Sequence, residues 1–108
     1  MNYSELSNPE INKMVADITG ASAPKIEEWG ISRSIPDYCN SPDYMWPVIA
    51  TNKISVVYDE AEAEWCAFGF FLFELGDWDM SIQPEIHHHD INPLRAAAIV
   101  FLMMQEHV

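Results

Sequence analysis

The chain has 108 residues, of which 49% are apolar, and this suffices for one hydrophobic core but not for two. Seventeen acidic residues stand against five basic ones, which gives a formal net charge of −12 at pH 7. That charge repels phosphate backbones, so direct nucleic-acid binding is disfavoured. We expect a single domain over residues 1–108, whose charge either keeps it soluble or presents an acidic face to a basic partner.

Neither a secretory leader nor a membrane span is predicted. The opening residues, MNYSELSNPEINK, lack a basic segment followed by an apolar one. No apolar stretch approaches the roughly 20 residues that cross a bilayer. We therefore expect a cytoplasmic protein without membrane contact, in which Cys39 and Cys66 are free thiols.

The first predicted helix covers residues 8–19. Ser7 and Glu10 have the spacing of a capping box, and Gly20 is a typical helix stop. Its apolar stripe comprises Ile11, Met14, Val15 and Ile18. Prolines and glycines predict mostly loop over residues 20–42, with Ile26, Trp29 and Ile31 holding the loop to the body.

A short second helix is predicted after Ser41, because a proline and an acidic residue follow this capping residue. Pro47 removes a backbone hydrogen bond, so we expect a kink or a later start near Met45. Alternation from Ile54 to Tyr58 then predicts a strand, and residues 59–62 a turn.

A long aromatic strand is predicted over Trp65–Phe73, forming an antiparallel hairpin with the strand before it. Gly69 within it suggests a bulge or a close approach by another backbone. A third strand near Met80–Ile82 has a weak signal, and Pro84–Asp90 is predicted as loop.

The last predicted helix begins at Asn92, a good N-cap residue, with Pro93 at the first helical position. From Leu94 to Met104 its only polar side chain is Arg95, so other parts of the protein must surround it. An apolar helix and an apolar sheet bury each other. We therefore predict an α+β fold, with a small antiparallel sheet packed against N- and C-terminal helices in two layers.

Three adjacent histidines are the most conspicuous candidate for chemistry. In extended backbone His87 and His89 would share one face, and either Asp90 or a carboxylate from the Asp59–Glu64 turn could complete a metal site. Adjacent histidines nevertheless lack the spacing of known zinc motifs, so a solvated polar loop is the competing interpretation.

Aromatic side chains and one arginine are the candidates for binding. Core packing explains most aromatics, whereas exposed ones among Tyr38, Trp46 and Trp78 could anchor a protein interface. Arg95 either pairs with Asp90 or Glu85 or binds an anion beside the helix start. No phosphate loop, dinucleotide fingerprint or HExxH motif is present, so we assign no catalytic residue and expect no cofactor.

Three segments together resemble a known family: MNYSELSNPEINK, IPDYCNSPDYMWPVIATNKISV and NPLRAAAIVFLMMQE. They are similar to NinX, a family of small proteins encoded in the nin region of lambdoid bacteriophages and prophages. The resemblance covers about half of the chain. It implies a phage or prophage protein of the bacterial cytoplasm with an accessory role, and it transfers no catalytic residue.

Three hypotheses about function follow. The first is a non-enzymatic accessory protein that modulates a host or phage protein through surface contact. The second is a small metal-binding domain or metal-dependent enzyme using His87 and His89. The third is an acidic DNA mimic that inhibits a DNA-binding protein. Each of the three hypotheses is compatible with a homodimer formed at an exposed edge of the hairpin.

Overall fold

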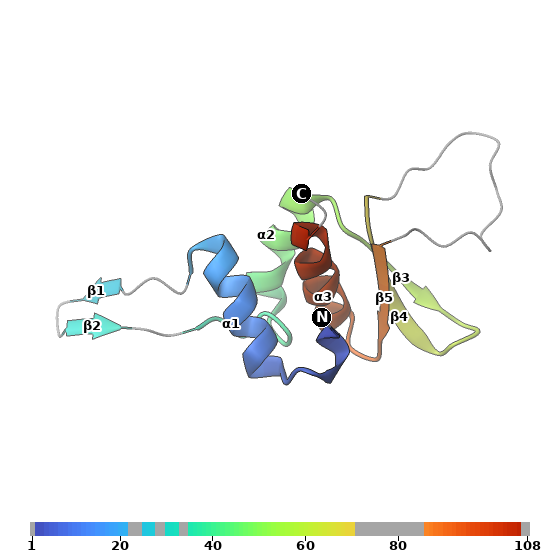
Figure 1. The fold of residues 1–108 in the computed structure, drawn as a ribbon, viewed down its shortest axis with the longest axis horizontal. Helices are drawn as coiled ribbons and strands as arrows, with labels where there is room; N and C mark the ends of the chain where they lie inside the picture. The colour runs from blue at the N-terminus through green and yellow to red at the C-terminus, as the bar shows by residue number, and fades with distance from the viewer. Residues whose placement is uncertain (1, 22–24, 28–29, 33–34, 71–85, 107–108) are drawn as a thin grey trace.

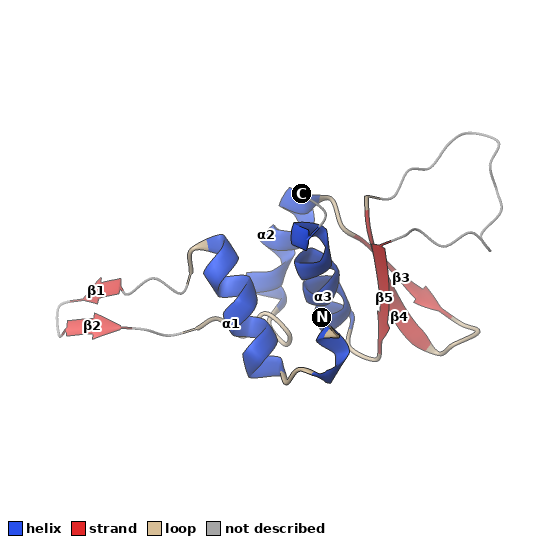
Figure 2. Cartoon of the chain, viewed as in Figure 1, coloured by secondary structure: helices blue, strands red, loops and turns tan. Residues whose placement is uncertain are grey.

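The protein is an α+β domain in which the helices lie on one side of a three-stranded sheet (Figure 2). The computed structural model describes residues 2–21, 25–27, 30–32, 35–70 and 86–106. A 3-10 turn spans Tyr3–Glu5, and the helices are α1 (Asn8–Thr19), α2 (Pro42–Asn52) and α3 (Pro93–Glu106). The strands are β1 (Lys25–Glu27), β2 (Gly30–Ser32), β3 (Ser55–Asp59), β4 (Glu64–Gly69) and β5 (Ile86–Asp90). The predicted fold class is confirmed.

Helix α3 is the centre of the core. It contacts all three strands of the antiparallel sheet β3-β4-β5 on one side and α1 and α2 on the other (Figure 1). Every residue from Ala96 to Leu102 is buried, as an all-round apolar helix requires. Among the described residues no helix has the length and hydropathy to cross a bilayer, and α3, the longest, has 14 residues.

Capping residues place α1 and α3 where the sequence predicts them. The Ser7 hydroxyl accepts from the Glu10 amide, and the Glu10 carboxylate accepts from the Ser7 amide. Gly20 ends α1 in the left-handed conformation, at φ 85°. At α3, Oδ1 of Asn92 accepts from the amides of Leu94 at 2.9 Å and Arg95 at 3.3 Å.

Two asparagines attach the turn before α2 to the helices on either side of it. Nδ2 of Asn92 donates to the carbonyl of Cys39 over 2.6 Å. Asn12, the one buried polar side chain among the described residues, accepts from the Cys39 amide at 3.0 Å and donates to Asp37 at 2.8 Å. These bonds position the start of α2 relative to α1 and α3.

The first correction concerns residues 86–90, which the sequence predicts as loop. They form β5 and pair with β4, from Trp65 opposite Asp90 to Gly69 opposite Ile86. The three histidines have no apolar alternation, so the segment has no strand signal of its own. Hydrogen bonding to β4 makes it a strand.

The second correction concerns the long aromatic strand, of which the structure shows β4 ending at Gly69, while residues 71–73 lie outside the described residues. Phe70 has a φ of 56°, and this left-handed conformation breaks an extended strand. At Gly69 the sequence predicts a bulge or a close approach by another backbone, whereas the structure has a close approach by the side chain of Met104. A Cβ atom there would lie 2.7 Å from Cγ of Met104 on α3. The weakly predicted strand at Met80–Ile82 lies outside the described residues.

The third correction concerns residues 20–42 and the start of α2. β1 and β2 form a short antiparallel hairpin on the far side of the helices from the sheet (Figure 1), so the strands of Ile26 and Ile31 lie away from the body. Trp29 lies outside the described residues. α2 begins at Pro42, so a later start near Met45 is wrong; it contains Pro47, where a kink stays a prediction.

Candidate functional site

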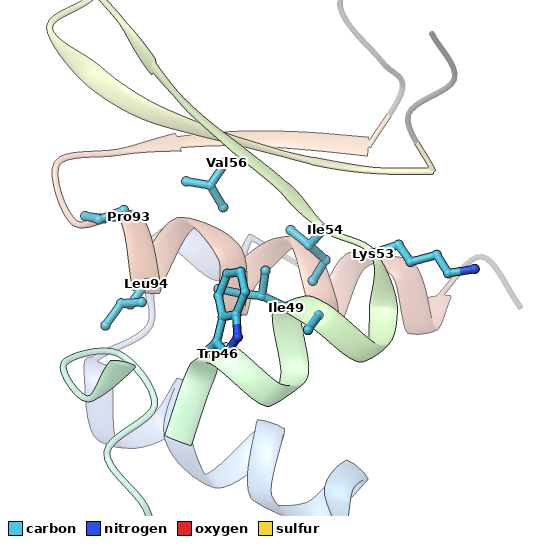
Figure 3. A pocket seen from close by; sticks show the side chains of 8 residues that line it. Trp46, Ile49, Lys53, Ile54, Val56, Pro93 and Leu94 are labelled. Atoms are coloured by element: carbon cyan, nitrogen blue, oxygen red, sulfur yellow. The ribbon is translucent and has the colours of Figure 1, made fainter. Parts of the chain in front are cut away.

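An open apolar groove lies between α2, β3 and the start of α3 (Figure 3). Its volume is about 430 Å³. The wall on α2 consists of residues three, four and seven positions apart, which share one side of a helix: Trp46, Ile49, Ala50 and Lys53. Ile54 and Val56 form the opposite wall, and Pro93 and Leu94 close one end.

Trp46 is the most conspicuous side chain of this groove. It is 64% exposed, although tryptophan is usually well buried. Its indole lies over the groove, near Ile49 and toward Leu94 (Figure 3). A large, rigid and exposed aromatic side chain in an apolar hollow is a typical anchor for a protein contact.

Lys53 lies at the opposite end from Pro93 (Figure 3). It ends α2 in the left-handed conformation, at φ 55° and ψ 46°, which is uncommon for a residue other than glycine or asparagine. This turn reverses the chain from α2 into β3, and the Ile54 amide donates to the carbonyl of Ile49 over 3.0 Å. Among the residues that the structure describes, no carboxylate lies within ion-pair distance of Lys53.

The apolar surface continues from the groove along β3. Tyr58 lies two residues beyond Val56 and therefore on the same face of the sheet. It is exposed and packs edge-to-face on Trp65, with ring centroids 5.2 Å apart. Ile91, directly after β5, is 81% exposed. Exposed apolar side chains that adjoin an apolar groove, as Tyr58 does along β3, are a mark of interaction surfaces.

Arg95 forms the predicted ion pair with Asp90. Its Nε lies 3.1 Å from the carboxylate, and the Arg95 side chain is 13% exposed. The guanidinium also donates to Oδ1 of Asn8 and to the carbonyls of Ser4 and Leu6. Because the protein itself takes up these donors, Arg95 ties the N-terminal segment to β5 and α3.

The histidines of β5 divide between the two faces of the sheet. His88 lies opposite Ala67 on the face toward α3, whereas His87 and His89 share the other face, as the alternation predicts. Nε2 of His89 lies 3.3 Å from the carboxylate of Asp59.

Asp90 lies on the α3 side of the sheet, where Arg95 and the Asn92 amide bind its carboxylate. Within the described part of the chain, no three His, Cys, Asp or Glu residues are arranged to hold a metal ion. Metal binding by His87 and His89 stays a prediction.

Both cysteines are free and buried. Burial disfavours the thiolate and raises the pKa of Cys39 to about 11, with nearby Arg95 opposing the shift. Burial also raises the pKa of Cys66. Neither thiol has the lowered pKa of an activated nucleophile.

Of the candidate binding residues that the structure describes, Trp46 alone lines the groove. Tyr38 is 4% exposed and its hydroxyl lies 3.2 Å from that of Thr19, so it is not the exposed anchor considered above. Trp78 lies outside the described residues. Sequence reasoning missed Lys53 and the other lining residues, for which the spacing of Trp46, Ile49, Ala50 and Lys53 was the available signal.

The fold and the groove define a small α+β protein with an exposed apolar groove. The model of the family described as Bacteriophage P22, NinX, matches residues 2–105, nearly the whole chain. The protein therefore belongs to this family, and the resemblance found in the sequence is confirmed. Searches of curated proteins and of solved structures found no significant match.

Proposed function

We propose that this protein is a phage accessory protein that acts in the host cytoplasm by binding a host or phage protein through the groove. The observation that carries the proposal is the exposed Trp46 in an apolar hollow. An aromatic anchor gains most when a partner removes it from water, at about 25 cal/mol per Å² of apolar surface. Membership of the phage family supports the accessory role.

The shape and lining of the groove also fit a binding role. The groove is open rather than enclosed, and its lining is almost entirely apolar (Figure 3). It therefore suits an inserted side chain of a partner better than a small polar substrate, which needs several converging polar groups.

Site-specific photo-crosslinking during phage infection tests this proposal. A photoreactive phenylalanine analogue replaces Trp46 in one strain and Tyr44 in a matched control. Tyr44 is the matched control because it is another exposed aromatic residue of α2 that faces a different groove. We expect a discrete crosslinked protein from position 46 that is missing from position 44. Identical crosslinking patterns from the two positions would contradict the proposal.

A further inference from the structure

We propose that the partner binds as an extended segment that pairs with the free edge of β3, with apolar side chains in the groove and a carboxylate at Lys53. This inference rests on the proposed function, because it gives the conformation and the chemistry of the segment that the same groove receives. Three features of the molecule support it: an unpaired edge of the sheet, the place of the groove beside that edge, and the charge of the groove lining.

β3 is an edge strand of the sheet. The strand order is β3-β4-β5, so β3 pairs on one side with β4. Among the residues that the structure describes, no backbone hydrogen bond reaches the other side of β3. Because the amides and carbonyls of a strand point alternately to its two sides, this free side offers donors and acceptors to an added strand.

The residues of β3 do not protect this edge. Natural edge strands are often protected by proline, by lysine or by a bulge. The sequence of β3, SVVYD, contains neither proline nor lysine, and its register with β4 runs without a bulge from Ser55 to Asp59. Val57 and Tyr58 are exposed and belong to the residue types that strands favour. β3 is therefore an accessible template for a further strand.

The groove lies where an added strand would project its side chains. Its described lining includes β3 but no residue of β4 or β5, so it borders the β3 edge of the sheet. α3 packs mainly on β4 and β5 and much less on β3, which leaves the face of Val56 toward α2 partly uncovered (Figure 3). An added strand would lie about 5 Å from β3, and every second side chain would share the face of Val56. These side chains would enter the groove toward Trp46.

The charge of the lining selects an acidic residue in the bound segment. Lys53 is the one charged residue among the described residues that line the groove, and it lies at the end where β3 begins (Figure 3). A carboxylate on the bound segment would pair with this ammonium group, whereas a basic side chain would be repelled. The net charge of −12 disfavours a strongly acidic segment. One carboxylate in an otherwise apolar segment is therefore the best match.

Other occupants use these features less well. A helical segment bonds its own backbone internally, so it would leave the free edge of β3 to water. A second copy of this chain carries the same net charge of −12, and the two copies would repel each other. An extended segment of another protein uses the strand edge, the apolar lining and the cation together.

A displayed library of random peptides is the first probe. Peptides are selected on the wild-type protein and counter-selected on Trp46→Ala, which should fold because Trp46 is largely exposed. Each retained peptide is then resynthesised with one backbone amide methylated at a time, and its affinity is measured. Only alternate amides of an added strand point toward β3. We therefore expect losses of about tenfold at every second amide and little change at the amides between them, which serve as the internal control.

Two lysine replacements test the carboxylate. Lys53→Met removes the charge of the groove and keeps an apolar side chain of similar length. Lys13→Met is the matched control, since Lys13 is an exposed lysine of α1 outside the groove. We expect the retained peptides to carry Asp or Glu near one end. Lys53→Met should weaken their binding about three- to fivefold, and Lys13→Met by less than about 1.5-fold.

The outcomes separate this inference from the proposed function. Losses without a two-residue period along the peptide, or equal effects of the two lysine replacements, would overturn the inference and leave groove binding intact. If no retained peptide depends on Trp46, or if the chain proves to be a dimer that buries Trp46, the proposed function fails as well.

Discussion

Nε of Arg95 lies 3.1 Å from the carboxylate of Asp90, and this contact joins the first turn of α3 to the last residue of β5. Through its other donors Arg95 also holds the backbone of Ser4 and Leu6. One largely buried cation thus connects the N-terminal segment, the sheet and the central helix. These contacts stabilise the end of α3 that borders the groove.

Replacement of Arg95 by methionine should therefore destabilise the fold. It leaves the Asp90 carboxylate without its cation and removes the donors that reach two carbonyls, so we expect a loss of about 3 kcal/mol in the free energy of unfolding. Urea denaturation measures this loss of stability. The control is Lys13→Met, which breaks the exposed Lys13–Asp17 pair and should change stability by less than about 0.5 kcal/mol. Similar losses in the free energy of unfolding in both variants would show that the contacts of Arg95 do not stabilise the fold.

Gly69 should tolerate no side chain. A Cβ atom would lie 2.7 Å from Cγ and 2.8 Å from Sδ of Met104, so Gly69→Ala should cost about 1–3 kcal/mol through overpacking. A double-mutant cycle with Met104→Ala, followed by thermal unfolding, tests the cause. We expect the alanine at position 69 to cost much less once Met104 is truncated. Purely additive losses would rule out this contact.

Lys53→Gly should raise stability while it removes the cation of the groove. Glycine adopts the left-handed conformation of residue 53 without steric cost, and we expect a gain of about 0.5 kcal/mol after the greater entropy of the unfolded chain is counted. Lys53→Ala is the matched variant, since it removes the charge and keeps the strain. Chemical denaturation should give Lys53→Gly a larger free energy of unfolding than Lys53→Ala. The reverse order would refute the claim that residue 53 is conformationally strained.

Acidification should destabilise the protein through His88. Burial lowers the pKa of His88 from its ordinary 6.5, and nearby Asp90 opposes this shift. Below pH 6.5 the unfolded chain therefore binds a proton that the folded protein does not, so stability falls as the pH drops through that window. Urea unfolding at about pH 7.5 and about pH 5.5 measures the loss. We expect His88→Gln to reduce this loss, whereas His87→Gln, on the other face of the sheet, serves as the control. An unchanged loss in His88→Gln would assign the effect to other groups.

Sequence signals within a few residues predicted those features of the fold that depend on neighbouring residues, such as the helix starts. The capping box of Ser7 and Glu10 and the cap at Asn92 set the starts of α1 and α3 correctly, because a side chain near a helix end satisfies amides only a few positions away. The apolar pattern of residues 94–104 likewise predicted a surrounded helix. The histidine strand had no such signal, since its pairing depends on β4, which lies about twenty residues earlier in the chain.

The sequence by itself determined the α+β class and the buried C-terminal helix, because composition, periodicity and capping are properties of contiguous residues. The resemblance of three segments to the phage family was also present in the sequence, and the match of the family model confirms it. Only the tertiary structure decided that Arg95 connects the N-terminal segment with β5 and α3. It also decided that Asp90 and His89 lie on opposite faces of the sheet, and that Trp46 shares a groove with Val56 and Leu94. These relationships join segments that are distant in the chain. Packing of α3 against both the sheet and α2 brings them together, and no local pattern encodes that packing.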